Sequence, residues 1–265
     1  MDLLLIRPND QKAVYSDVIS NAACEPPFWA AVIASYAMNK GIDVEIIDAE
    51  VLNQNPEETA CLVGKSSSKV IGIIVTGTHL SASTQKMQGA SILAKEIKKV
   101  CKAPIFMWGL HPSSLPEKTI KEESVDYVIK GEGLETISGL VECIKYKNFN
   151  QELLSSLKGL YYCIGDTVVG NSEIGLENIE LMPPPAWDLL PMNLYKAHNW
   201  HRLTQSTKTL NTGYGVVATT LGCPFNCDFC AISSLFGQHA VRYKSPEKVI
   251  KEIDELVCEY GVYYI

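Results

Sequence analysis

Over its first 146 residues the sequence alternates short apolar runs with longer segments whose apolar residues recur at a helical period. The short runs predict strands at residues 3–6, 44–47, 70–75, 105–108 and 125–129. The periodic segments predict helices at residues 26–39, 87–101 and 135–145. Strands that alternate with helices form parallel sheets covered on both faces. We therefore expect an α/β fold that begins with a Rossmann-like, flavodoxin-like doubly wound parallel sheet.

Three short loops follow strands of this expected sheet, and each contains glycine. They are Thr76-Gly77-Thr78-His79, Gly109-Leu110-His111-Pro112 and Gly131-Glu132-Gly133. Ligands of doubly wound sheets bind at the carboxyl ends of the strands, and glycine lets the backbone approach a ligand closely. Each loop taken alone is equally typical of a tight turn. Because three such loops share one rim, we expect a ligand site there.

The character of the sequence changes after residue 147. Residues 160–164 and 167–169 flank Gly165-Asp166 and predict a hairpin. The run Pro183-Pro184-Pro185 excludes a helix interior or a central strand. Residues 171–213 are therefore expected to form a linker, and its tryptophans favour packing against the rest of the chain.

The strand and helix alternation restarts near the end of the chain. We expect a strand at residues 216–219, a cysteine loop, a helix capped by Ser245 with Pro246 at its first position, and a strand at residues 262–265. The whole chain is thus expected to comprise residues 1–147, 148–213 and 214–265. A β/α barrel needs about 200 residues, so the last part predicts only the first βαβ unit of an incomplete barrel, and the chain is expected to be a fragment of a longer protein.

Composition excludes several classes of protein. The net charge of −7 disfavours nucleic-acid binding, and the apolar runs are far shorter than the roughly 20 residues that span a bilayer. The N-terminus resembles no secretory leader, so a cytoplasmic location is expected. Nine cysteines, an odd number in a chain this long, disfavour a secreted disulfide scaffold. Six of them are spread along the sequence, which is typical of cysteines that serve as small buried apolar residues.

The other three cysteines fall within eight residues, as Cys223-x3-Cys227-x2-Cys230. Thiolates this close can converge on one soft metal centre, and iron–sulfur and zinc are the candidates. An iron–sulfur site commonly has four protein ligands, so three leave one iron of a [4Fe–4S] cube open for chemistry. Zinc requires a fourth ligand, for which His201 or His239 is a candidate, but the paired spacing typical of zinc sites is missing. A purely structural cluster of cysteines is the remaining alternative.

This motif, with Phe229 before its third cysteine and a strand before it, resembles the signature of the radical S-adenosylmethionine family. The resemblance implies that Cys223, Cys227 and Cys230 hold a [4Fe–4S] cluster whose open iron binds S-adenosylmethionine. It further implies that Phe229 lies near the adenine and that the reduced cluster cleaves S-adenosylmethionine to a 5′-deoxyadenosyl radical. An electron donor of the flavodoxin or ferredoxin type is then required.

The preceding residues resemble the cobalamin-binding domain found ahead of the radical domain in one subgroup. The resemblance rests on the second and third glycine loops and on the linker from Pro184 to Pro191. On this reading cobalamin contacts are expected from Thr76, Gly77, His79, Gly109, His111, Gly131 and Glu132. For His79 and His111, a loop histidine with hydrogen-bond partners inside the protein is the equally weighted alternative. Glu132 is equally placed to cap the helix after it. Leu110 and Leu134 depart from the subgroup, where glycine and an acid are usual.

The chain contains no Asp-x-His-x-x-Gly motif, which supplies a histidine to cobalt in several other cobalamin proteins. Any bound cobalamin is therefore expected to lack a protein imidazole on its cobalt. The implied function is that of a cobalamin-dependent radical enzyme that transfers a methyl group to an unactivated carbon or phosphorus centre, or catalyses a rearrangement. A non-catalytic binding module with a degenerate cobalamin domain is the alternative, and the sequence does not identify the small-molecule substrate.

Overall fold

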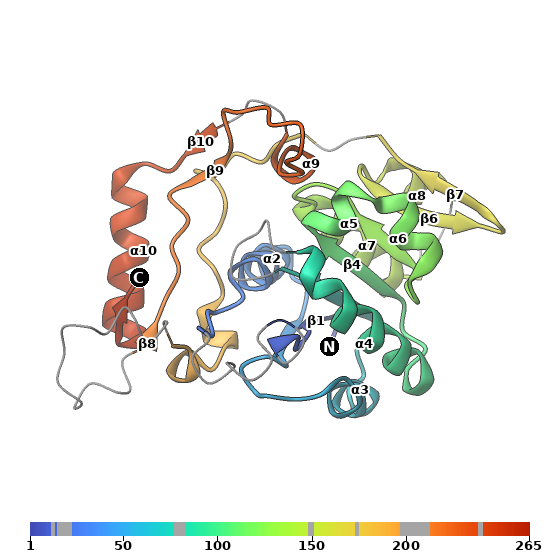
Figure 1. Cartoon of the computed structure of the whole chain (residues 1–265), viewed down its shortest axis with the longest axis horizontal. Coiled ribbons are helices and arrows are strands. Elements are labelled where there is room, and N and C mark those ends of the chain that lie inside the picture. The colour runs from blue at the N-terminus through green and yellow to red at the C-terminus, as the bar shows by residue number, and fades with distance from the viewer. Residues whose placement is uncertain are drawn as a thin grey trace.

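The computed structural model describes residues 1–11, 14, 23–76, 83–147, 151–172, 175–196, 213–237 and 241–265. Its largest sheet has seven strands in the order β2-β1-β3-β4-β5-β6-β7 (Figure 1). The strands are β1 (Leu3–Arg7), β2 (Val44–Asp48), β3 (Val70–Val75), β4 (Ile105–Gly109), β5 (Tyr127–Ile129), β6 (Leu160–Ile164) and β7 (Thr167–Gly170). The first five are parallel, in the order of flavodoxin-like sheets. The expected doubly wound sheet is confirmed.

Helices cover both faces of this sheet. They are α2 (Phe28–Asn39), α3 (Pro56–Lys65), α4 (Met87–Val100), α5 (Leu110–Ser114), α6 (Pro116–Glu122), α7 (Leu134–Lys145) and α8 (Gln151–Ser156). Successive side chains of a strand point to opposite faces. Leu3 and Leu5 of β1 therefore pack with α2 and α7, whereas Leu4 and Ile6 pack with α3 and α4. Each face is a separate hydrophobic core, which explains why β3 is buried along its whole length.

Four helices that pack on this sheet were not predicted, namely α3, α5, α6 and α8. The best signal was at α3, where Asn55 accepts a hydrogen bond from the backbone N–H of Glu58 and the Glu58 side chain accepts one from the backbone N–H of Asn55. This capping box, with Pro56 at the first helical position, is recognisable in the sequence. The predicted hairpin is confirmed: β6 and β7 are antiparallel and extend the sheet beyond β5.

The linker packs against the rest of the chain, as expected, and α2 is among the elements that it contacts. It contains two 3₁₀ turns, η4 (Trp187–Leu189) and η5 (Met192–Leu194). Trp187 is buried, and the backbone N–H of Ala186 donates to the carbonyl of Ala31 in α2. Trp200 lies outside the described residues. The described part of the linker therefore covers the helix that follows β1.

The C-terminal part forms two small sheets beside the large one (Figure 1). Its elements are β8 (Gly213–Tyr214), β9 (Thr220–Gly222), α9 (Ser233–Phe236), β10 (Val241–Tyr243), α10 (Pro246–Tyr260) and β11 (Val262–Tyr264). The pair β8 and β11 is parallel, and the pair β9 and β10 is antiparallel. The predicted strand at residues 216–219 is wrong, because this segment connects β8 to β9 and each of those strands pairs with a different partner.

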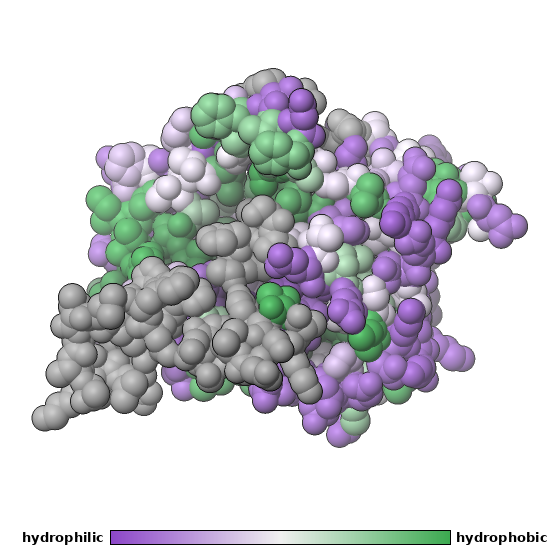
Figure 2. Space-filling model, viewed as in Figure 1, coloured by the Kyte–Doolittle hydropathy of each residue, from purple (hydrophilic) through white to green (hydrophobic). Residues whose placement is uncertain are grey.

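Helix α10 has the expected ends. Ser245 accepts a hydrogen bond from the backbone N–H of Lys248, and Gly261 adopts the left-handed conformation that ends the helix. Its apolar stripe is only partly covered. Leu256 is buried, but Val257 is 46% exposed, and apolar side chains gather on the surface over this helix (Figure 2, left). Over the described residues no helix is long and apolar enough to cross a membrane.

Candidate cofactor site

The carboxyl ends of the parallel strands bring the expected rim residues to one edge of the sheet. Thr76 follows β3, Gly109 ends β4, and Gly131 and Glu132 follow β5. Thr76 is buried. Gly77 and His79 lie outside the described residues. The structure thus places four of the predicted positions, and His111 in α5, along the edge where ligands of such sheets bind.

Gly109 is fixed by backbone geometry. Its φ of 146° is one that residues with a Cβ rarely adopt, and a Cβ there would lie 2.3 Å from the carbonyl oxygen of Val75. The hydroxyl of Ser83 donates to that same carbonyl and accepts a hydrogen bond from the backbone N–H of His111. These contacts join the ends of β3 and β4. The edge between the two strands is therefore bare backbone, with no side chain at Gly109.

His111 lies half-buried at the start of α5. Its Nδ1 is 3.0 Å from the hydroxyl oxygen of Thr84. Burial, and secondly the nearby charge of Lys118, lower the pKa of His111 below its usual value. The imidazole is therefore neutral at pH 7, and Thr84 fixes the direction of its ring.

The loop Gly131-Glu132-Gly133, called the GEG loop below, is held rigidly against β4. The indole N–H of Trp108 donates to the carbonyl oxygens of Gly131 and Glu132, at 2.9 and 3.0 Å. Gly133 has a φ of 66°, and a Cβ there would lie 2.3 Å from the side chain of Ile129. Gly131 also has a positive φ, of 77°. The turn therefore favours glycine at both positions, as the turn interpretation of this loop predicts.

Glu132 does not cap the helix after it. Helix α7 begins without a side-chain cap. The Glu132 carboxylate is buried and instead accepts hydrogen bonds from the Arg242 guanidinium in β10 and from the backbone N–H of Glu177 in the linker. The capping interpretation is therefore wrong, and the side chain connects the rim to the C-terminal part.

The cysteine loop comes directly after β9. Cys223 is partly buried, while Cys227 and Cys230 are exposed, and the backbone N–H of Cys230 donates to the carbonyl of Cys227. All nine cysteines are free thiols. Phe229 is 93% exposed. Among the residues that the structure describes, no three potential ligands converge in a metal-binding geometry; His201 and His239 lie outside those residues.

Helix α9, just after the cysteine loop, is packed into the core of the large sheet. It contacts α5 at the carboxyl end of β4. Phe236 is buried, and its ring centroid lies 5.6 Å from that of Trp29, which lies 5.3 Å from that of Trp108. Aromatic rings at these separations attract one another beyond simple burial. The cysteine loop therefore lies beside the carboxyl edge that carries the rim residues.

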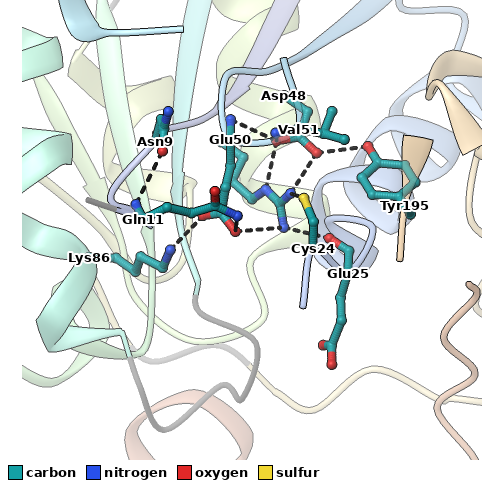
Figure 3. A network of polar contacts seen from close by, with 10 residues as sticks. Asn9, Gln11, Cys24, Glu25, Asp48, Glu50, Val51, Lys86 and Tyr195 are labelled. Atoms are coloured by element: carbon teal, nitrogen blue, oxygen red, sulfur yellow. Dashed lines mark hydrogen bonds and ion pairs between the residues drawn. The ribbon is translucent and has the colours of Figure 1, made fainter. Parts of the chain in front are cut away.

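A second polar cluster, which the sequence analysis missed, lies at the carboxyl ends of β1 and β2 (Figure 3). Arg7 forms two hydrogen bonds of 2.7 Å to the carboxylate of Asp48 and donates to the carbonyl of Glu25. The hydroxyl of Tyr195, from the linker, donates to Asp48 at 2.7 Å. Burial, and then Asp48, raise the pKa of Tyr195, so it stays protonated and keeps this hydrogen bond. The signal in the sequence was a charged residue at the end of each of two neighbouring parallel strands, Arg7 of β1 and Asp48 of β2.

Two further acids extend this cluster. Lys86 forms an ion pair of 2.5 Å with Glu50, which also faces Arg7. Burial alone would raise the pKa of Glu50, but these two cations hold it below its usual value. Asp10 is 3% exposed, and neither of its carboxylate oxygens has a hydrogen-bond partner among the described residues. Burial raises the pKa of Asp10 to about 6.

An open hollow of about 400 Å³ lies next to this cluster, between the loop after β1, the start of α3 and α4. Amide side chains dominate its wall: Asn9, Asn53, Gln54, Asn55 and Gln88. The side-chain oxygen of Gln54 is buried without a hydrogen-bond partner among the described residues. Such an orphaned acceptor fits a ligand that carries N–H donors.

Residues 17–141 match the family model of the B12 binding domain. The matched segment contains β2, β3, β4 and β5 with the rim loops after β3, β4 and β5, and β1 precedes it.

Two curated relatives cover nearly the whole chain. An uncharacterized methyltransferase of Pyrococcus horikoshii is 32% identical over 99% of the chain and 52% of its own length. The anaerobic magnesium-protoporphyrin IX monomethyl ester cyclase of Cereibacter sphaeroides is 25% identical over 99% of the chain and 39% of its own length. The chain thus spans about half or less of the length of these relatives.

Solved structures share the fold at low identity. The radical S-adenosylmethionine methyltransferase TsrM from Kitasatospora setae, with cobalamin and a [4Fe–4S] cluster bound, has a TM-score of 0.65 and 16% identity, over 97% of this chain and 46% of TsrM. The cobalamin-dependent S-adenosylmethionine radical enzyme OxsB, with aqua-cobalamin and S-adenosylmethionine bound, has a TM-score of 0.69 and 17% identity, over 98% of this chain and 32% of OxsB.

Proposed function

We propose that this chain holds the cofactors of a cobalamin-dependent radical S-adenosylmethionine enzyme. The premise is twofold: residues 17–141 match the B12 binding domain, and the chain shares its fold with such enzymes over nearly its whole length. The observation that carries the proposal is the position of the cysteine loop. Helix α9, which follows the loop, contacts α5. Strand β10, which pairs with the strand before the loop, contacts the GEG loop through Arg242. A cluster on this loop would therefore lie next to a ligand bound at the carboxyl edge.

The donor set of the loop fits an iron–sulfur cluster. Cys223, Cys227 and Cys230 offer three soft thiolates from one short segment. The exposed ring of Phe229, next to Cys230, supplies a flat apolar surface against which the adenine of S-adenosylmethionine would pack. When bound, the cluster supplies an electron to S-adenosylmethionine, and cobalamin supplies a methyl group.

The carboxyl edge fits cobalamin, whose periphery carries primary amides. The orphaned oxygen of Gln54 and the amide-lined hollow beside it complement amide N–H donors. The bare backbone at Gly109 lets a flat ligand approach the strand ends. The residues proposed to contact cobalamin are Thr76, Gly77, His79, Gly109, His111 and Gly131. The carboxylate of Glu132 accepts hydrogen bonds from Arg242. At Glu132, therefore, only the backbone is proposed to contact cobalamin.

We further propose that no protein imidazole binds the cobalt, since the Asp-x-His-x-x-Gly motif is missing from the sequence. Electron paramagnetic resonance of cob(II)alamin on ¹⁵N-labelled protein tests this point. The nitrogen splitting of the cobalt signal should match that of unlabelled protein. A splitting that changes with the label would identify a protein nitrogen on cobalt and refute the assignment.

The reaction of the whole protein is proposed to be methyl transfer to an unactivated carbon or phosphorus centre, or a rearrangement. The two relatives described above, a methyltransferase and a cyclase, support this range. An electron donor of the flavodoxin or ferredoxin type would reduce the cluster.

Cysteine variants test the cluster assignment. After anaerobic reconstitution with iron and sulfide, Cys223→Ala, Cys227→Ala and Cys230→Ala should each lose the brown colour and the bound iron. Cys258→Ala is the matched control, because this thiol is also exposed but lies on α10. Iron and sulfide retained by the three loop variants would refute the assignment, and zinc without sulfide in the native protein would favour a structural zinc site.

A further inference from the structure

The buried carboxylate of Glu132 connects three segments that are distant in the sequence. Arg242 in β10 contacts both of its oxygens, and the backbone N–H of Glu177 donates to one of them at 2.9 Å. Arg242 also donates to the carbonyl of Glu177 at 2.5 Å. The GEG loop, the linker and β10 therefore meet at one ion pair, and the side chain of Glu132 is fully buried within it.

The sheet side of this ion pair is immobilised. Trp108 binds the carbonyls of Gly131 and Glu132, and the hydroxyl of Ser113 accepts a hydrogen bond from the backbone N–H of Gly131. The left-handed Gly133 fixes the other end of the loop. Glu132 thus presents its carboxylate from a loop whose backbone is held to β4 and α5.

The other side of the ion pair is in register with the cysteine loop. Arg242 pairs with Leu221 in the β9–β10 ladder, and Val241 pairs with Gly222. Cys223 follows Gly222 directly. Two paired positions of this ladder therefore separate Arg242 from Cys223. A movement of Arg242 relative to the sheet edge would shift the first cysteine with it.

Stability alone is a weak explanation for this ion pair. The cost of removing two charges from water offsets much of their attraction, so a buried pair can often be replaced by neutral residues without loss of stability. What neutral residues do not reproduce is the two-pronged, directional contact of a guanidinium with a carboxylate. The pair is suited to fix a position rather than to add stability.

We propose that Glu132 is a positioning residue: through Arg242 it sets the place of the cysteine loop relative to the carboxyl edge of the sheet. The proposal rests on the proposed function, in which the loop holds the cluster and the edge holds cobalamin. Glu132 then acts on the distance between the two cofactors and not as a cobalamin ligand. Helix α9, through Phe236 and Trp29, holds the downstream end of the same loop.

Hydrogen exchange of the full chain without cofactors tests the proposal by mass spectrometry. The variants are Glu132→Gln, which removes the charge in the same shape, and the double variant Glu132→Gln with Arg242→Met, which leaves no unpaired charge. The control is Glu252→Gln, which breaks a buried ion pair with Lys244 of similar burial inside the C-terminal part. Urea unfolding of each protein gives its stability.

A positioning role predicts that the hydrogen-bonded amides of residues 220–237 exchange about tenfold faster in both Glu132 variants. The double variant should show this although its stability is restored to that of the native chain, and Glu252→Gln should leave exchange in residues 220–237 unchanged. Native exchange in the double variant, or equal acceleration in the control, would overturn the proposal. Failure of the proposed function would appear separately, as absence of bound iron in the reconstituted native chain.

Discussion

Asp10 gives the most quantitative prediction of this structure. The residue follows β1 and lies against the start of α4, where a Cβ on Gly89 would lie 1.9 Å from one of its carboxylate oxygens. It is buried, and no hydrogen-bond partner for either oxygen is among the described residues. The buried groups of this cluster, with Asp10 included, have three carboxylates, those of Asp10, Asp48 and Glu50. Among the described residues they face two buried cations, Arg7 and Lys86, so the carboxylates outnumber the cations by one.

The size of the effect follows from the shift in pKa. Burial raises the pKa of Asp10 from 3.8 to about 6. A difference of about two pKa units between the folded and unfolded states corresponds to about 3 kcal/mol. The folded state binds the proton more tightly, so the cost of ionising Asp10 is absent below pH 4. This cost appears as the pH rises from 4 to 6 and is fully present above that range.

The change to test is Asp10→Asn, which removes the ionisable group with little change in shape. Urea unfolding at several pH values gives the free energy of unfolding of the native chain and the variant. The variant should gain up to about 3 kcal/mol relative to the native chain between pH 4 and pH 8. Asp166→Asn, in the exposed turn between β6 and β7, is the control and should show no such gain. A difference for Asp10→Asn that is flat with pH would refute the account of this cluster.

Three further substitutions test the packing around the site, each by urea unfolding. Gly133→Ala should cost about 1–3 kcal/mol more than Gly41→Ala, because both glycines have positive φ but only the first would clash, with Ile129; equal costs would contradict this. Trp29→Ala should cost about 3–5 kcal/mol, and a loss below about 1 kcal/mol would contradict its central packing. Arg7→Met should cost about 3–5 kcal/mol by leaving Asp48 and Glu50 without their shared cation; a neutral effect would show that they have other partners.

The doubly wound sheet was predictable because its strands are continuous apolar runs and the helices α2, α4 and α7 are long and amphipathic or apolar. Local rules also placed the ends of α10. Residues 216–219 were misassigned because a β-branched run favours a strand but does not supply a pairing partner: these residues are partly buried or exposed, and the strands on either side, β8 and β9, pair elsewhere. Helix α3 was missed although the capping box at Asn55 and Glu58 is present in the sequence.

The candidate site was predictable only in part, because sequence patterns locate loops but not the partners of side chains. The rim loops lie at one edge as the topology requires. The partner of Glu132 is Arg242, 110 residues later, and the partner of Asp48 is Arg7, 41 residues earlier. No local spacing encodes such pairs. The shared position of charged residues at strand ends was the one signal available for the cluster at Arg7.

The presence of both cofactors on one chain is the central claim, and metal analysis tests it most directly. The native chain is reconstituted anaerobically with iron and sulfide, mixed with cobalamin, passed through a gel-filtration column and analysed for cobalt, iron and sulfide. The account predicts about one cobalt and about four irons with four sulfides per chain, eluting together with the protein. Cobalamin that elutes separately from the protein, or a protein peak without iron, would contradict it.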